Sequence, residues 1–434
     1  MKRFVTILAF LGAVNTGFAQ DVDKLIGQDD VTRIIKTLSA DDMQGRATFT
    51  PGIEKAAKFI ENEYKTIGLQ PMAGNSGFRQ NFSMIRSSAV KTSVSINGAD
   101  VPTDNYIMAS NTSFSWTKAE DATVAVITAD MDFRKEYRKY LSAGKSTLVI
   151  VDPKNEVFFK RLQNYLKSNT SFKDEPTAPP LVFILGKYDE VKSFNVSDEV
   201  KREELPLFNI AGIIPGKTKP DEFVVFSGHY DHLGILTGAN VMQGDSIANG
   251  ADDDASGTTA VITLARYFKK LNNNARTLVF VAFTAEEIGE YGSAYFAKTV
   301  NPDKVMAMFN IEMIGKASKW GINSAFITGI ERSDFGPILQ KNLEGTAFKF
   351  YADPYPEQNL FYRSDNASLA RVGVPAHTIS TDQIDSDKLY HTVKDEFSSL
   401  DVANITATIK AIALSSKTIV SGQDTPTRVA KLEN

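Results

Sequence analysis

The order of apolar and polar residues predicts helices near the amino-terminal end of the chain and a strand after them. From Ala56 to Ile67 apolar residues recur at helical spacing, and Gly68 follows as a helix stop. Residues 90–96 instead alternate apolar and polar positions, as a half-buried strand does, before the turn Asn97-Gly98. This part of the chain therefore changes from helical to strand periodicity.

From residue 207 onward, strand-like and helix-like patterns alternate. Apolar runs at 223–226, 278–283 and 305–311 have the composition of strands, and the second is fully apolar, as buried parallel strands are. Helical stretches at 258–271 and 291–300 separate them. This rhythm predicts an α/β fold with a mostly parallel central sheet flanked by helices.

Residues 100–204 follow a different pattern. Short β-like runs at 124–128, 147–151 and 180–185 alternate with a polar, Lys-rich helical stretch near 158–167, and no motif of catalytic type occurs there. We expect a smaller, β-rich inserted accessory domain. The main domain would then be discontinuous and consist of residues 20–99 and 205–434.

The first residues have the layout of a secretory signal peptide. Lys2 and Arg3 precede an apolar run over 4–14, which is too short to span a bilayer, and small residues follow up to Ala19. We expect cleavage after Ala19 and a periplasmic or secreted protein. The chain has no cysteine, which excludes disulfides and thiolate zinc sites.

Composition narrows the range of partners. The 434 residues are 42% hydrophobic and 23% charged, which is ordinary for a globular protein with a sizeable core. The formal net charge is −4, so neither nucleic acid nor an anionic membrane surface is favoured as a partner.

Acidic and imidazole side chains follow each strand-like run of the second half. His229, Asp231 and His232 come after the first run, Glu286-Glu287 after the second, and Glu312 after the third. The carboxyl ends of parallel strands lie along one edge of a sheet, where open α/β folds bind their ligands. We therefore expect these side chains to converge on one crevice.

Three adjacent carboxylates, Asp252-Asp253-Asp254, precede the helical stretch that begins near Thr258. Such neighbours repel one another unless cations, hydrogen-bond donors or solvent are close. A capped helix start is one interpretation and a metal site is another. A calcium-binding EF-hand loop is excluded, because its twelfth position would be Thr263, where a bidentate Glu is needed.

The residue pairs suggest a division of roles. At a strand end, His229 can bind a metal while Asp231, two residues later, fixes the tautomer of its ring. Of Glu286 and Glu287, one carboxylate can bind a metal while the other accepts a proton from activated water.

Three other histidines complete the set of four. His391 is a natural last metal ligand. His377 lies within a strand-like segment and is expected to be structural. His232 fits either support of the metal ligands or packing of its loop.

These motifs resemble the co-catalytic di-zinc exopeptidases of metallopeptidase family twenty-eight, which include bacterial leucyl aminopeptidases and glutamate carboxypeptidase. The similarity also covers an opening segment around Arg46 and an insertion of the protease-associated type at 100–204. The matching segments occur in family order and are GHYDHLG (228–234), NGADDDASG (249–257), AEEIG (285–289), NIEMIG (310–315), Ser364-Asp365 and YHT (390–392).

The resemblance implies two zinc ions per chain and one role for each matched residue. Glu286 would be the catalytic base, Asp231 would orient His229, and Tyr390 would donate a hydrogen bond to the oxyanion. Asp253 would bridge the two ions, because it stands four residues before the Gly of Ser-Gly, as the bridging Asp of the family does. The implied metal ligands are His229, Asp253, Glu287, Glu312 and His391.

Two positions depart from the family pattern. Glu312 stands where Asp is usual, and Asn366 stands where His often follows Ser-Asp. Since Glu and Asp both bind zinc through oxygen, we expect the metal site to survive the first change. The change at Asn366 affects the substrate pocket and not metal binding, because this position is not a metal ligand in the family.

The expected function is hydrolysis of the first peptide bond of peptide substrates by an aminopeptidase. A carboxypeptidase of the same family is the nearest alternative, and it would need a cationic clamp for the substrate carboxylate, for which Arg363 is one candidate. A non-catalytic, peptidase-like binding protein is a third interpretation, although such proteins typically lose metal ligands. A one-zinc glutaminyl cyclase fits less well, because all five ligand positions are retained.

Overall fold

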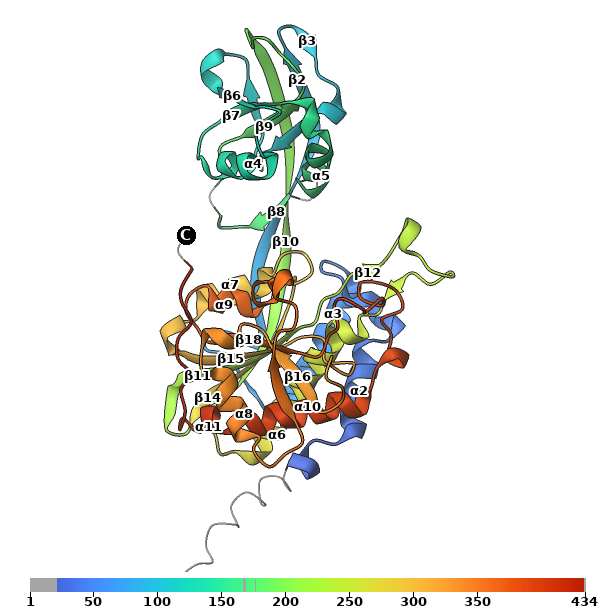
Figure 1. Ribbon diagram of the computed structural model, residues 1–434, viewed down its shortest axis with the longest axis vertical. Coiled ribbons are helices and arrows are strands. Elements are labelled where there is room, and N and C mark those ends of the chain that lie inside the picture. Colours follow the sequence, from blue (N-terminus) through green and yellow to red (C-terminus); the bar gives the residue numbers. More distant parts are fainter. Residues whose placement is uncertain (1–21, 167–168, 176, 433–434) are drawn as a thin grey trace, which may run out of the picture. The chain divides into compact units, whose positions relative to one another are not determined.

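The computed structural model describes residues 22–166, 169–175 and 177–432 (Figure 1). They form two compact units, one comprising the chain up to Phe82 and from Leu207 onward, the other Ser83–Pro206. The predicted signal peptide and its cleavage point after Ala19 lie outside the described residues.

The larger unit is built on a central sheet with the strand order β17-β16-β18-β15-β11-β14-β10. The neighbours β14, β11, β15 and β18 are parallel, as are β16 and β17, whereas β10 and β16 run antiparallel to β14 and β18. This confirms the predicted α/β fold with a mostly parallel central sheet. The strands are β10 (Phe194–Ile214), β11 (Lys219–His229), β14 (Arg276–Phe283), β15 (Val305–Ile311), β16 (Ser324–Ile327), β17 (Lys349–Ala352) and β18 (Ala376–Ser380).

Alternation of side chains along the strands gives the sheet two buried faces. Val224 and Phe226 of β11 belong to one core, and Val225 between them belongs to the other. The first core is covered by α2 (Gln28–Leu38), α3 (Pro51–Ile67), α6 (Gly257–Leu271) and α10 (Val402–Ser415), and the second by α7 (Tyr291–Thr299) and α9 (Asn366–Ala370). Helices on both faces explain why the strands are apolar throughout.

The helices begin and end where local chemistry favours it. Pro51 occupies the first turn of α3, where its missing N–H costs no hydrogen bond. Gly68 ends α3 in the left-handed conformation with φ 80°, and Asn272 ends α6 in the same region with φ 48°.

The smaller unit has its own four-stranded sheet, β4-β9-β7-β6, in which β6, β7 and β9 are parallel. Phe133 of α4 and Phe159 of α5 pack on one face of this sheet. Its elements are β4 (Tyr106–Ala109), β6 (Thr123–Ile127), α4 (Phe133–Ser142), β7 (Thr147–Val151), α5 (Glu156–Leu166) and β9 (Leu181–Leu185).

The smaller unit begins at Ser83, earlier than the boundary near residue 100 expected from the sequence. The difference arises in β2 (Arg79–Ile96), a single strand that contains the predicted strand at 90–96. Val94 and Ile96 at its end pack with Leu148 and Ile150 of β7, so they belong to the core of the smaller unit.

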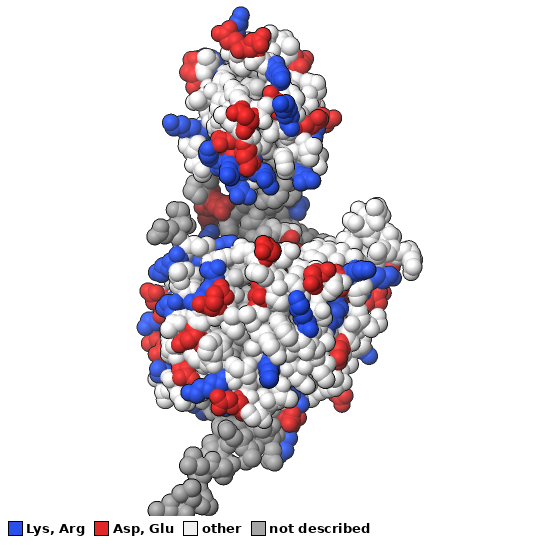
Figure 2. Space-filling view, viewed as in Figure 1, with Lys and Arg blue, Asp and Glu red and all other residues white. Residues whose placement is uncertain are grey.

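Acidic and basic side chains are interspersed on the face of each unit that Figure 2 shows. Among the described residues, no helix is both long and apolar enough to cross a membrane.

Candidate metal centre

Three neighbouring parallel strands deliver the candidate ligands to one edge of the central sheet. His229 is the last residue of β11, Glu312 follows the last residue of β15, and Glu286-Glu287 lie three and four residues beyond Phe283, which ends β14. Since β11 pairs in parallel with both β14 and β15, the ends of the three strands are neighbours. The side chains that follow these strands therefore converge, as expected from the sequence.

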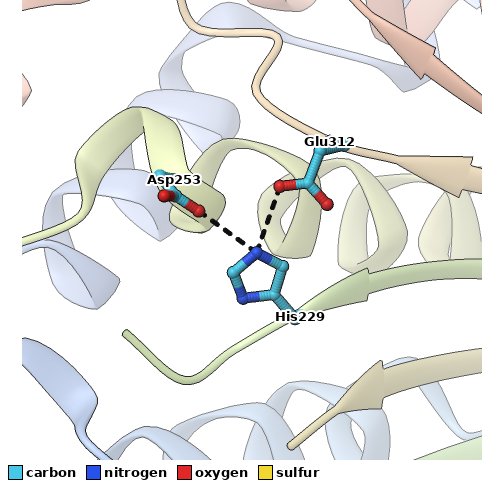
Figure 3. Close-up of side chains that lie close together, drawn as sticks. All are labelled: His229, Asp253 and Glu312. Atoms are coloured by element: carbon cyan, nitrogen blue, oxygen red, sulfur yellow. Dashed lines mark hydrogen bonds and ion pairs between the residues drawn. The ribbon is translucent and has the colours of Figure 1, made fainter. Parts of the chain in front are cut away.

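One group of side chains surrounds the Nε2 atom of His229. The Oδ1 atom of Asp253 and the Oε1 atom of Glu312 each lie 3.1 Å from this nitrogen (Figure 3). An Oε2 atom of Glu286 lies 3.9 Å from it. An imidazole and two carboxylates thus face a common point.

A second group lies on the other side of Asp253. Its Oδ2 atom is 3.1 Å from Nε2 of His391, which is 3.2 Å from Oε2 of Glu287. The Nδ1 atom of His232 lies 2.6 Å from Oε1 of Glu287 and 3.8 Å from Oδ2 of Asp253. Since the two oxygens of Asp253 face different histidines, its carboxylate joins the two groups.

Hydrogen bonds explain why Asp253 alone of the three aspartates faces the histidines. The carboxylate of Asp252 accepts the N–H of Gly315 at 2.7 Å and pairs with Lys316 at 3.2 Å. Asp254 accepts N–H groups from three residues, Gly257, His229 and Met313, at 2.9 to 3.1 Å. The carboxylates of Asp252 and Asp254 therefore hold the neighbouring main chain and do not face the histidine rings.

The orienting contact of His229 differs in detail from the expectation. Its Nδ1 atom lies 3.0 Å from the main-chain carbonyl oxygen of Asp231 but 3.8 Å from the carboxylate. Donation from Nδ1 to this carbonyl leaves the Nε2 lone pair free for a metal. The Asp231 carboxylate instead accepts the N–H groups of Glu286 at 3.1 Å and Glu287 at 3.3 Å, and so positions that pair.

Two further supporting residues were not identified from the sequence. Asp395 accepts the main-chain N–H groups of Asp252 and Asp253 at 3.0 to 3.1 Å. Arg46 is fully buried and donates to four carbonyl oxygens, among them those of Asn249 and Gly250, at 2.5 to 2.9 Å. Arg46 lies in a segment that resembled the family, whereas Asp395 carried no signal beyond its position four residues after His391.

The two departures from the family pattern have clear surroundings. Glu312, one methylene longer than Asp, receives a hydrogen bond at its Oε2 atom from Ser364 at 2.7 Å. The amide of Asn366 donates to the carbonyls of Phe361 and Ala376 at 3.0 and 3.2 Å. Glu312 therefore reaches the Nε2 atom of His229. Asn366 links the segment that contains Phe361 to the strand that contains Ala376.

Two other candidates line a cavity shared with Asp253, Glu286 and Glu312, namely Tyr390 and Arg363. The Tyr390 ring stacks on that of His391 with centroids 3.8 Å apart. His377 is not part of these groups. Its Nδ1 and Nε2 atoms contact the Thr328 carbonyl and the Ser333 hydroxyl at 2.8 and 2.7 Å, and burial lowers its pKa to about 4.

Burial makes this collection of charges unstable without a cation. Burial and the nearby carboxylates of Glu312 and Asp365 raise the pKa of Glu286 well above its usual value, against an opposing effect of His229. Burial acts on Asp253 in the same sense, but the adjacent histidines hold its pKa well below the usual value. Divalent cations would neutralise this excess of acid groups.

The donor atoms fit zinc in kind and in spacing. The ligand atoms of His229, Asp253 and Glu312 lie within 4.8 Å of one another, as do those of His232, Asp253 and Glu287. Zinc takes imidazole nitrogen and carboxylate oxygen in such mixed sets. Both groups can therefore hold a metal ion.

The comparisons with known proteins agree with this geometry. A model described as peptidase family M28 matches residues 209–415, which include every candidate ligand. The part of the chain that carries the candidate metal centre is therefore similar to peptidase family M28. One relative is leucine aminopeptidase 1 of Ajellomyces capsulatus (strain NAm1 / WU24), 30% identical over 261 residues. That match covers 56% of this chain and 66% of the relative, so the chain spans just under two thirds of its length.

Solved structures share the fold of this chain. An aminopeptidase from Aneurinibacillus sp. strain AM-1 aligns with a TM-score of 0.55 and 17% identity, covering 95% of this chain and 97% of that one. A zinc aminopeptidase from Bacillus subtilis aligns with a TM-score of 0.54 and 15% identity, covering 92% and 97%. At these identities the likeness concerns the fold.

Proposed function

We propose that this chain is an exported zinc aminopeptidase that releases residues one at a time from the amino end of peptides. The observation that carries the proposal is the pair of side-chain groups joined by Asp253, beside a cavity that Glu286 also lines. The names of the relatives, leucine aminopeptidase and zinc aminopeptidase, support the same activity.

Two zinc ions would be held by five residues, with Asp253 shared between them. In this arrangement His229, Asp253 and Glu312 would hold one ion, and Asp253, Glu287 and His391 would hold the other. Bound zinc supplies Lewis-acid polarisation of the scissile carbonyl and lowers the pKa of water to about 7.

Glu286 is proposed as the proton carrier of the reaction. Its carboxylate lines the cavity near His229 without taking one of the 3.1 Å positions at the Nε2 atom. It would accept a proton from the attacking water while the water oxygen bonds to the carbonyl carbon. It would then pass this proton to the amine nitrogen as the carbon–nitrogen bond breaks.

Asp231 and Tyr390, the remaining predicted site residues, would act in different ways. The main-chain carbonyl of Asp231 fixes the His229 ring, and its carboxylate fixes the backbone of Glu286. The Tyr390 side chain lines the same cavity as Glu286, where its hydroxyl would donate a hydrogen bond to the developing oxyanion. Burial and four nearby carboxylates, Asp253 first among them, raise the Tyr390 pKa, so the proton needed for donation is retained.

A carboxypeptidase remains the second candidate because Arg363 lines this cavity too. Peptides blocked at one end separate the two activities. An aminopeptidase cleaves leucyl peptides with an amidated carboxyl end and rejects those with an acetylated amino end, whereas a carboxypeptidase shows the reverse preference. Absence of turnover across a broad panel of both kinds, with zinc present, would contradict the proposal and favour a non-catalytic binding protein.

We also propose that the chain is exported and that the smaller unit is an insertion of the protease-associated type. The export proposal rests on residues 1–19, and amino-terminal sequencing of the protein released from its native host tests it. A mature chain that starts at Gln20 is expected, and retention of Met1 would contradict export by this route.

A further inference from the structure

The cavity beside the metal centre contains a carboxylate that the proposed chemistry does not use. Asp382 follows the end of β18 and lines the cavity together with Glu286, Glu312 and Tyr390. The residue is only 8% exposed, and its Oδ1 atom has no hydrogen-bond partner among the described residues. A buried carboxylate oxygen without a hydrogen-bond partner is costly, and a ligand that donates a hydrogen bond to it would remove this cost.

Two hydroxyl groups of this cavity, those of Thr378 and Ser380, already donate their protons within the protein. Ser380 donates to the carbonyl of Met313 at 3.1 Å, and Thr378 donates to Oδ1 of Asn366 at 2.8 Å. A hydroxyl group carries a single proton, so these two groups can offer only lone pairs to a ligand. Together with Asp382 they make the cavity rich in hydrogen-bond acceptors.

Neither of the nearby cations, Lys316 and Arg363, forms an ion pair with Asp382, although Arg363 also lines the cavity. Lys316 lies 3.2 Å from Asp252 and 2.5 Å from Asp387, and Arg363 is exposed and donates to Gln358 at 3.2 Å. Burial, with repulsion from Asp252 and Asp387, raises the pKa of Asp382 to about 7 in spite of Lys316. The protein therefore supplies no cation dedicated to this carboxylate.

The rest of the cavity wall is apolar. It is formed by side chains that suit the methylene groups of a long side chain, namely Met313, Phe326, Leu360 and Ile384. An apolar wall combined with a buried carboxylate matches an amphipathic side chain, which has a hydrocarbon stem and a cationic end. A purely aliphatic side chain such as leucine would leave the acceptors desolvated without donors.

We propose that this cavity receives the side chain of the substrate's amino-terminal residue and selects lysine or arginine, with Asp382 as the specificity-determining residue. The inference rests on the aminopeptidase function proposed above. The ammonium or guanidinium group would donate to Asp382 and to the hydroxyl oxygens, and the stem would lie along the apolar wall.

Substrates that differ only in the cationic end test the inference. Lysyl and norleucyl 4-nitroanilides have the same stem length, and we expect kcat/KM to favour lysyl by about 10- to 100-fold, the effect of one charge-assisted hydrogen bond. Asp382→Asn should abolish most of this preference by raising KM for the lysyl substrate, and Asp382→Glu should restore part of it. Asp385→Asn is the matched control, since Asp385 is exposed and does not line the cavity.

The outcomes separate the two proposals. Failure to cleave any amino-terminal residue overturns the aminopeptidase function itself. Cleavage of norleucyl or leucyl substrates as fast as lysyl and arginyl substrates overturns only the specificity. If Asp382→Asn fails to fold, the lysyl-to-norleucyl ratio of the unmodified protein decides, as does competitive inhibition by free lysine compared with free norleucine.

Discussion

Glu286 and Glu287 are neighbours in the chain, yet their carboxylates meet different partners. Glu287 contacts His232 and His391 at 2.6 and 3.2 Å, whereas Glu286 lies 3.9 Å from His229. Asp231 holds both backbones, so the two side chains diverge from one fixed point. Adjacent residues of one type can thus serve as ligand and as base.

Substitution of the two glutamates should therefore have different consequences. We expect Glu286→Gln to reduce kcat by about 10²- to 10⁴-fold, the usual contribution of general acid–base catalysis, while two zinc ions remain bound. Glu287→Gln should lose zinc as well as activity. Steady-state kinetics and metal analysis of both variants check this, and loss of zinc from Glu286→Gln would contradict the assignment.

His391 and His232 both approach Glu287, and the structure supports a different role for each. Nε2 of His391 lies 3.1 Å from Asp253, whereas Nδ1 of His232 is 3.8 Å from it and 2.6 Å from Glu287. We expect His391→Ala to reduce the zinc stoichiometry from two to one. His232→Gln should keep two sites but weaken one by about 10- to 100-fold, as loss of a supporting contact does. Zinc titration of the metal-free variants measures both effects. Two zinc sites in His391→Ala and only one in His232→Gln would contradict these roles.

At the scale of elements, the periodicity of the chain predicted most of what positions the site. The apolar runs at 278–283 and 305–311 are β14 and β15, and the helical stretch at 258–271 is α6. The strands could be predicted because burial on both faces makes them apolar throughout. The helix could be predicted because burial of one face makes it amphipathic. Glu286, Glu287 and Glu312 followed from the ends of these strands, whereas Asp253 was chosen from the resemblance to the family.

What could not be predicted depends on contacts between distant segments. Arg46 holds the carbonyls of Asn249 and Gly250, and Asp395 holds the N–H groups of Asp252 and Asp253 that follow. Both residues are far away in sequence, and no local pattern encodes these contacts. The end of β2 packs inside the smaller unit, although its alternation alone is equally compatible with either unit. Tertiary hydrogen bonds and packing decided both cases.

Arg46 offers a test of how one short element supports another. It ends the 3₁₀ segment Asp41–Arg46, and its guanidinium donates to carbonyls at Leu38, Tyr230, Asn249 and Gly250. Arg46→Met would leave these buried acceptors without a donor, so we expect the free energy of unfolding to fall by about 3 to 5 kcal/mol. Denaturant unfolding measures the loss.

The matched control for Arg46 is Arg33→Met. Arg33 is 46% exposed and forms ion pairs at the surface with Asp30 and Glu63, so we expect a loss of at most about 1 kcal/mol. Equal losses of unfolding free energy in Arg46→Met and Arg33→Met would show that the buried contacts of Arg46 add no stability beyond that of a surface ion pair.

At the scale of the whole molecule, the buried acid groups make metal-free stability depend on pH. Burial raises the pKa of Asp231 and Asp395 to about 6 and that of Asp252 and Glu290 to about 7. Burial lowers the pKa of His391, but hydrogen bonds to Asp253 and Glu287 outweigh this and raise it to about 10. At these five groups the folded chain binds more protons than the unfolded chain, so their contribution to stability falls as pH rises through their folded pKa values.

We expect the metal-free protein to be less stable at pH 9 than at pH 6, by about 2 kcal/mol after allowance for the partial exposure of His391. Zinc should reduce or reverse this dependence, because zinc binds the deprotonated ligands. Unfolding at the two pH values, with a chelator and with zinc, measures both effects. Stability of the chelated protein that rises from pH 6 to pH 9 would contradict the charge arrangement.

The central claim is that Asp253 joins two metal positions at the edge of the sheet. Anomalous diffraction at the zinc absorption edge, from crystals of the protein grown with zinc, tests it most directly. We expect two peaks on either side of the Asp253 carboxylate, one contacted by His229 and Glu312 and the other by Glu287 and His391. A single peak, or two peaks that share no ligand, would contradict it.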